Sequence, residues 1–177
     1  MGLATDHIKS SRIEALKIAL FARPWRLEHL LADFATDPGF ASFASQAALV
    51  DRLFVGDSVE AIFSALETDG SDWAKALLET LLTKSPQALK VAHRQLTFGA
   101  ASTDFAEHMA MEFRLGARLV HRHDFLQGVR AVIVAKDNDP RWFPGDLAEV
   151  SDAMIDQIFA PLPPDQEWTP LREGLRA

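Results

Sequence analysis

The sequence predicts an all-α, multi-helix protein with about seven to eight helices. Apolar residues recur at intervals of three and four along most of the 177-residue chain, and strict alternation of apolar and polar residues is hard to find. Ser, Asp, Gly and Pro, the residues that start and stop helices, separate these apolar stripes. Hydrophobic residues make up 48% of the chain and charged residues 24%, so we expect a packed core rather than disorder.

Three helices are expected in the first third of the chain. An apolar stripe over residues 13–20 ends before Pro24, and a second stripe over residues 27–34 ends before the turn residues Asp37-Pro38-Gly39. A third apolar segment lies around residues 49–54. The spacing within each stripe is typical of one buried helical face.

Capping residues mark the helices in the middle of the chain. We expect Asp57 to cap the next helix, with Glu60 reaching back to it, and Asp69-Gly70 to stop that helix. Further expected starts and stops are Ser71, Ser85-Pro86 and Gly99.

The last third is expected to contain the longest helix, over roughly residues 104–122, with Glu112 inside its apolar face. Asp124 is predicted to cap the following helix, with Gln127 in the reciprocal capping position. A final helix is expected near residues 151–159, and the Pro-rich stretch that follows is predicted to be extended.

Composition excludes several classes of function. The chain has 18 Lys and Arg against 25 Asp and Glu, a net charge of −7 without a basic patch, so we predict no nucleic-acid partner and no membrane partner. The absence of Cys excludes disulfides, thiolate catalysis and Cys-based metal sites. No run approaches the ~20 apolar residues of a membrane span, and the first residues lack the apolar core of a signal peptide. We therefore predict a cytoplasmic protein.

The most specific pattern lies between residues 112 and 142. It reads E-F-R-L at 112–115, H-D-F-L-Q-G-V-R-A at 123–131, K-D at 136–137 and P-R-W at 140–142. In this order the pattern, called the family motif below, resembles the C-terminal part of the 3-hydroxyisobutyryl-CoA hydrolase family, a branch of the crotonase (enoyl-CoA hydratase/isomerase) superfamily. G-L-A-T at 2–5, D-G-S at 69–71 and S-P…R-Q-L between 85 and 96 extend the resemblance over almost the whole chain.

The resemblance implies a C-terminal helical half of an acyl-CoA thioester hydrolase of valine catabolism. It implies that residues 1–8 end the crotonase core, 9–84 form a helical linker lobe, 85–160 form a C-terminal helical lobe with the family motif, and 161–177 form an extended Pro-rich tail. The catalytic carboxylates and oxyanion-hole donors of the family lie upstream of G-L-A-T. No residue here inherits a catalytic role, and we predict that the chain is inactive alone.

The same resemblance suggests the partners. They are the acyl-CoA substrate, the missing crotonase core and a second copy of the chain, because helices that cover a core would leave an apolar face bare. Coenzyme A enters only as part of the substrate, and no separate cofactor is expected. Two alternatives stay open: a free-standing helical interaction module, and the C-terminal part of an enoyl-CoA hydratase or isomerase.

Few residues are candidates for a specific role. A carboxylate on a buried helical face must be paired, so Glu112 is predicted to form a structural ion pair with Arg94 or Arg130. His121 and His123 stand beside Asp124, yet their spacing matches no metal-binding motif, and no metal site is predicted.

Lys136 is the candidate for binding coenzyme A. When Gln127-Gly128 is matched to the coenzyme A-contacting helix of crotonases, Lys136 falls at a basic position near the end of that helix. The resemblance thus implies a contact with a coenzyme A phosphate. The alternative is a solvated lysine, which is favourable at any helix C-terminus.

Overall fold

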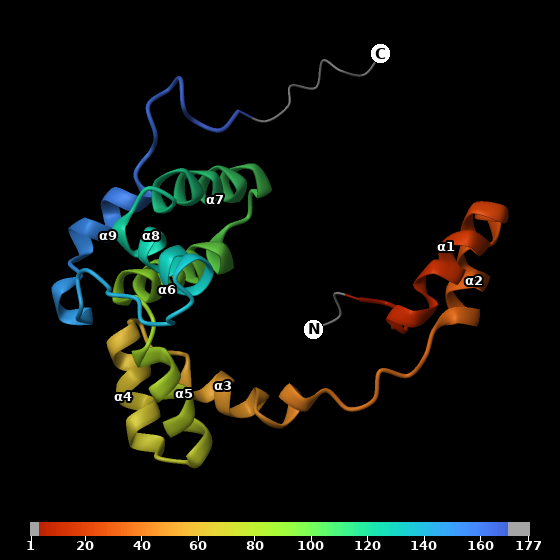
Figure 1. The fold of residues 1–177 in the computed structure, drawn as a ribbon, viewed down its shortest axis with the longest axis horizontal. Helices are drawn as coiled ribbons and strands as arrows, with labels where there is room; N and C mark the ends of the chain where they lie inside the picture. Colours follow the sequence, from red (N-terminus) through yellow and green to blue (C-terminus); the bar gives the residue numbers. More distant parts are fainter. Residues whose placement is uncertain (1–3, 170–177) are drawn as a thin grey trace. The chain divides into compact units, whose positions relative to one another are not determined.

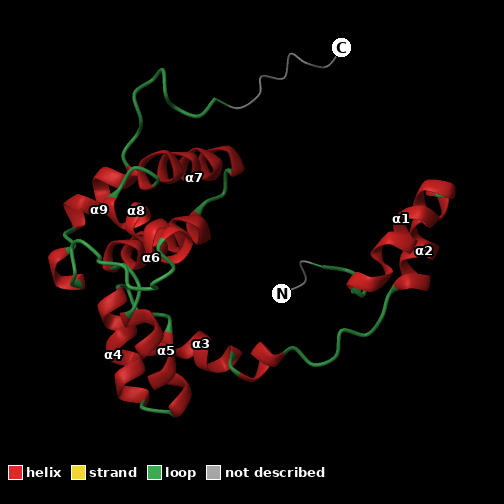
Figure 2. Ribbon diagram, in the orientation of Figure 1, coloured by secondary structure: helices red, strands yellow, loops and turns green. Residues whose placement is uncertain are grey.

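The computed structural model describes residues 4–169, apart from the side chain of Ser42. Within this range every regular element is helical and no strand is present, which confirms the all-α prediction (Figures 1 and 2). Nine α-helices lie in the described range: α1 (Ile13–Ala22), α2 (Leu27–Phe34), α3 (Ala47–Leu53), α4 (Val59–Asp69), α5 (Asp72–Leu82), α6 (Pro86–Ala101), α7 (Phe105–Leu119), α8 (His123–Val129) and α9 (Asp152–Phe159). A π-helical turn, η4 (Arg130–Val134), continues α8.

The chain divides into two compact units, one up to Val50 and one from Asp51 onward. The predicted division into lobes at residue 84 stays a prediction. The loop before α4 and the residue after α5 are bonded to later elements: His93 Nε2 lies 3.0 Å from the Gly56 carbonyl, and the Trp142 indole donates to the Thr83 carbonyl at 2.9 Å. Of the predicted terminal segments, residues 1–3 and 170–177 lie outside the described range.

The first unit is a hairpin of α1 and α2. Leu16 and Leu30 are buried between the two helices. Arg12 fastens the pair, since its guanidinium donates to the Phe34 carbonyl at 3.1 Å and lies 4.6 Å from the centre of the Phe34 ring. Such a small unit buries little apolar surface by itself.

The core of the second unit forms where α6, α7 and α9 meet. Its buried side chains are Val91, Met111, Leu115, Val150, Ile155 and Ile158. Leu66 of α4 is also fully buried. These helices present apolar residues three and four apart to one another, as the sequence periodicity predicts.

The predicted caps Ser71 and Ser85 are confirmed: their side chains accept hydrogen bonds at the starts of α5 and α6. Gly70 ends α4 in the left-handed conformation, as predicted, and the Ser151 side chain caps α9. Two corrections concern helix ends. Ser58, not Asp57, caps α4, because the extended backbone of Ser58 brings its hydroxyl 3.1 Å from the Ala61 amide. In addition, α6 continues past the predicted stop at Gly99 to Ala101.

Candidate functional site

Asp124, in the family motif, is a buried carboxylate that joins three segments of the chain. The Ser85 hydroxyl donates a short hydrogen bond to its carboxylate, and the Phe143 amide donates to Oδ1 at 2.8 Å. The prediction that Asp124 caps α8 is wrong: the helix begins one residue earlier, and its start has no side-chain cap. The carboxylate is turned away from the amides of its own helix and toward the start of α6.

Neighbouring residues reinforce this junction, which we call the Asp124 clamp (Ser85, Asp124 and Phe143). His123 Nε2 lies 2.9 Å from the Arg141 carbonyl, and the His123 ring meets the Phe143 ring edge-on. The Trp142 ring also packs close to Gly128 of α8. The clamp therefore holds the segment after η4 against α5, α6 and α8.

A second set of contacts surrounds the turn over residues 135–139, called the Lys136 turn. The Arg130 guanidinium donates to the Asp137 carboxylate and to the Asp139 carbonyl, each at 2.6 Å, while the Arg130 carbonyl accepts from the Ala135 amide at 2.7 Å. Hydrogen bonds from the Asp139 amide and from Arg130 lower the pKa of the Asp137 carboxyl. The turn is therefore fastened to the end of α8 on both sides of Lys136.

Lys136 itself is exposed, and its backbone φ of 56° lies in the left-handed region that most side chains avoid. Among the residues that the structure describes, its ammonium group makes no hydrogen bond or ion pair. Its predicted contact with a coenzyme A phosphate is neither shown nor contradicted and stays a prediction.

Glu112 has partners other than the predicted ones. Its half-buried carboxylate accepts two hydrogen bonds from the Gln95 amide, both at 2.7 Å, and lies 3.5 Å from His108 Nε2. Arg94 pairs with Asp156, and Arg130 pairs with Asp137. The Glu112–Arg130 ion pair is therefore not formed, because Glu112 faces α6 while Arg130 is occupied by the Lys136 turn.

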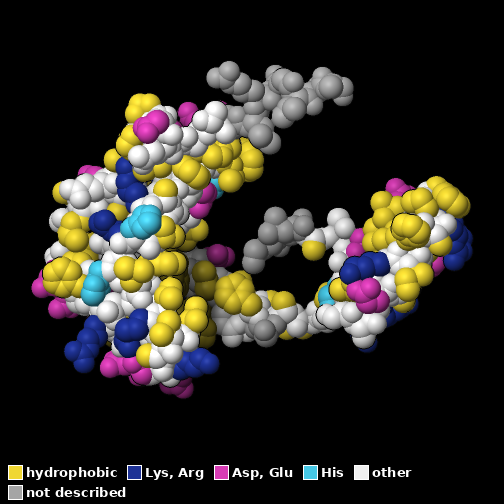
Figure 3. All heavy atoms as spheres, turned by 45° about the horizontal axis from the view of Figure 1, so that its top comes forward, with side chains coloured by type: hydrophobic (Ala, Val, Ile, Leu, Met, Phe, Trp, Pro, Cys, Tyr) yellow, Lys and Arg dark blue, Asp and Glu magenta, His cyan; other side chains and the backbone are white. Residues whose placement is uncertain are grey.

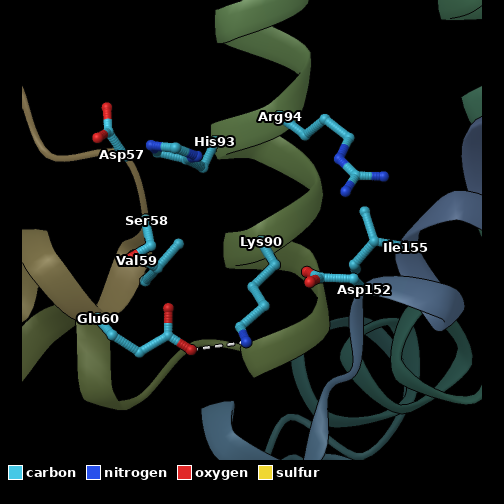
Figure 4. Close-up of a pocket in the computed structure, with 9 residues that line it drawn as sticks. All are labelled: Asp57, Ser58, Val59, Glu60, Lys90, His93, Arg94, Asp152 and Ile155. Atoms are coloured by element: carbon cyan, nitrogen blue, oxygen red, sulfur yellow. Dashed lines mark ion pairs between the residues drawn. The ribbon is translucent and has the colours of Figure 1, made fainter.

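A small hollow of about 130 Å³ lies beside α4, α6 and α9 (Figure 4). Within it the Lys90 ammonium pairs with Glu60 at 2.6 Å and donates to the Val150 carbonyl at 3.0 Å. The Lys90 ammonium thus joins α4, α6 and the segment before α9, which is typical of a structural junction. Sequence reasoning did not single out Lys90, because its partners lie 30 and 60 residues away.

The Glu60–Lys90 pair predicts a pH dependence. Burial raises the pKa of Glu60, but the hydrogen bond from Lys90 and the charges of Lys90 and His93 outweigh it, and the pKa falls below its ordinary value. A lowered carboxyl pKa gives stability that is present above the unfolded pKa, about 4.3, and lost as the pH falls through the folded pKa. We expect Glu60→Gln to reduce the free energy of unfolding at pH 7 slightly and to flatten its decline below pH ~4.5. Chemical denaturation at several pH values measures this, and a decline identical to that of the wild type would contradict it.

Neither a metal site nor a membrane span is found in the described part of the chain. Residues 4–169 contain no group of three or more His, Cys, Asp or Glu that is arranged to hold a metal ion. None of the helices among them is both long and apolar enough to cross a bilayer.

An apolar face is exposed on α8 and η4. Its exposed members are Phe125, Leu126, Val132, Ile133 and Val134, of which Ile133 is 65% and Val134 73% exposed. Figure 3 shows hydrophobic side chains gathered on the surface of α1 and α2 as well, and Phe21 there is 93% exposed. Contiguous apolar surface of this kind usually marks an interface.

Comparison with known proteins identifies the family. The enoyl-CoA hydratase/isomerase family matches residues 1–159. A mitochondrial 3-hydroxyisobutyryl-CoA hydrolase from Danio rerio is 43% identical over 171 residues, covering 92% of this chain and 44% of the relative. The corresponding protein from Xenopus laevis is 37% identical, covering 91% of this chain and 44% of the relative. The chain therefore spans less than half the length of these curated relatives.

Two solved structures share the fold. A carnitinyl-CoA dehydratase from Mycobacterium thermoresistibile superposes with a TM-score of 0.82 at 28% identity, covering 91% of this chain and 46% of that one. An enoyl-CoA hydratase from Rhodobacter sphaeroides superposes with a TM-score of 0.65 at 29% identity, covering 86% of this chain and 45% of that one. By the extent of the family match and the fold, this chain belongs to the enoyl-CoA hydratase/isomerase family, as its motif predicted.

Proposed function

We propose that this chain is the helical part of an acyl-CoA thioester hydrolase similar to 3-hydroxyisobutyryl-CoA hydrolase, and that it completes a longer enzyme. One observation carries the proposal: Glu112, Asp124 and Arg130 of the family motif are bound by other residues of this chain, while the apolar face of α8 and η4 is exposed. Residues that catalyse need free polar groups directed at a substrate. A surface that completes another domain needs apolar area instead.

The chemistry of the class supports this division of labour. Thioester hydrolysis requires a carboxylate that manages the attack on the carbonyl and backbone donors that stabilise the oxyanion. Here the carboxylates of Glu60, Glu112 and Asp124 are already bound by Lys90, Gln95 and Ser85, respectively. We propose that the reacting groups belong to the part of the relatives that this chain does not match, and that the chain is inactive alone.

The chain itself is proposed to contribute to substrate binding through Lys136. An exposed ammonium group is suited to a phosphate, and coenzyme A offers several. The adjoining apolar face, with Ile133 and Val134, would pack on the core and form part of the acyl-CoA pocket wall. The relatives are named as mitochondrial proteins; a cytoplasmic location of this chain stays a prediction.

Two chimaeras test the proposal. In one, this chain replaces the matching segment of the Danio rerio hydrolase; in the other, it replaces the matching segment of the Rhodobacter sphaeroides hydratase. Hydrolysis of 3-hydroxyisobutyryl-CoA and hydration of crotonyl-CoA are then measured, with each truncated relative and the isolated chain as controls. We expect hydrolysis by the first chimaera, little hydration by the second, and no activity in the controls.

Other outcomes select the alternatives. Thioester hydrolysis by the isolated chain would contradict the proposal directly. Activity of the hydratase chimaera alone would favour a hydratase parent, the class of both solved neighbours. The second unit has a core of its own, so inactive chimaeras together with a cooperatively folded chain would favour the helical interaction module.

A further inference from the structure

The Lys136 turn depends on one side chain. Arg130 donates from Nη1 to Asp137, from Nη2 to the Asp139 carbonyl and from Nε to Gln127, at 2.6, 2.6 and 3.0 Å. Its guanidinium therefore ties Gln127 of α8 to two residues that follow Lys136 in the turn. Only a planar fork with several donors can do this, since a lysine ammonium concentrates its donors at one point.

The conformation of the turn is costly without such support. Lys136 and Asn138 both have φ values near +55°, at 56° and 53°. For residues other than glycine this backbone is strained, and it persists only where surrounding contacts enforce it. Besides the contacts of Arg130, the Asn138 amide donates to the Ala131 carbonyl at 3.1 Å and the Asp139 amide donates to Asp137 Oδ1 at 3.0 Å.

Arg130 also controls the charge beside Lys136. Asp137 follows Lys136 directly, and its ionised carboxylate would attract the lysine ammonium if it were free. The ion pair with Arg130 occupies that carboxylate and holds it toward the end of α8. The Lys136 ammonium is thereby left available for an anion from outside.

We infer that Arg130 is a positioning residue that fixes the 135–139 turn so that Lys136 presents its ammonium group to the phosphates of an acyl-CoA. The inference rests on the proposed function, because the contact with acyl-CoA belongs to the completed enzyme. In this role Arg130 affects substrate binding by positioning Lys136 and does not itself contact the reacting atoms.

The first test examines the turn in the chain itself. Arg130→Lys keeps the charge and removes the fork, and Arg52→Lys is the matched control, because Arg52 forms a similar surface pair with Asp69 away from the turn. Hydrogen exchange of the Ala135 and Asn138 amides is measured by NMR. We expect at least about tenfold faster exchange in Arg130→Lys and wild-type rates in Arg52→Lys. Unchanged exchange in Arg130→Lys would overturn the inference.

The second test measures phosphate recognition in the active hydrolase chimaera. Two thioesters of the same acyl group are compared, one of coenzyme A and one of pantetheine, which lacks all the phosphates. We expect Arg130→Lys and Lys136→Gln each to raise KM for the coenzyme A thioester about tenfold, with kcat and the pantetheine reaction unchanged. The double variant should raise KM little further than either single variant, since both substitutions remove the same contact of Lys136 with a phosphate.

The two tests distinguish a failure of the positioning role of Arg130 from a failure of the proposed function. Faster exchange in Arg130→Lys with an unchanged preference for the coenzyme A thioester would overturn the positioning role, while hydrolysis by the chimaera would keep the proposed function. Equal losses for both thioesters would mean a general structural effect and would also overturn it. An inactive wild-type chimaera would remove the proposed function, and this inference with it.

Discussion

Replacing Asp124 by alanine is expected to lower the free energy of unfolding of the second unit by about 3 kcal/mol. The carboxylate accepts hydrogen bonds from the Ser85 hydroxyl and the Phe143 amide in a buried site, and hydrogen bonds to charged groups contribute about 1.5–3 kcal/mol each. Alanine leaves both donors without their acceptor. The Ser85 hydroxyl, which also caps α6 through the Ala88 amide at 3.0 Å, is expected to lose orientation as well.

Chemical denaturation monitored by circular dichroism measures this loss. Asp165→Ala is the matched control, because Asp165 is an exposed aspartate in a turn; it should change the free energy of unfolding by less than about 0.5 kcal/mol. Asp124→Asn should lie between the two, since its amide keeps one acceptor oxygen. Equal stability of Asp124→Ala and Asp165→Ala would show that the Asp124 clamp contributes nothing to folding.

Replacing Ile158 by alanine should cost about 3–4 kcal/mol. Ile158 is fully buried in the core between α6, α7 and α9, and removing its methyl and methylene groups leaves a cavity. Ile133→Ala makes the same chemical change at a side chain that is 65% exposed. In the isolated chain it should change the free energy of unfolding by no more than about 0.5 kcal/mol.

The same pair of variants tests the proposed docking of the apolar face. In the hydrolase chimaera Ile133 would be covered by the core, so Ile133→Ala should now lower the melting temperature measurably, while Ile158→Ala lowers it in both settings. An Ile133→Ala effect that remains negligible in the chimaera would place the interface elsewhere on the chain.

Local patterns predicted the helices well. Ser71, Ser85 and Ser151 cap helices through amides three residues ahead, and the apolar stripes that follow them face the core. Information of this kind is contained within a few consecutive residues. The error at Asp57 is a shift of one residue, since the residue that caps α4 is Ser58.

Partners distant in the sequence were not predictable. Asp124 has the spacing of a capping residue, yet its acceptor oxygens bind residues 39 positions before it and 19 positions after it. Glu112 was predicted to pair with Arg94 or Arg130, but its carboxylate binds the Gln95 amide instead. The sequence alone does not show which of several charged residues will contact Glu112. The packing of α6 on α7 places Gln95 beside it.

The contacts within the family motif show why this pattern can indicate family membership without indicating catalytic activity. His123 binds the Arg141 carbonyl, Arg130 binds Asp137 and Gly128 lies against Trp142, so these parts of the pattern are satisfied once this helical region has folded. A gene fragment can keep such a signature intact after losing every reacting group. Genome surveys that count hydrolases by this signature will therefore count folded remnants and separate subunits together with whole enzymes.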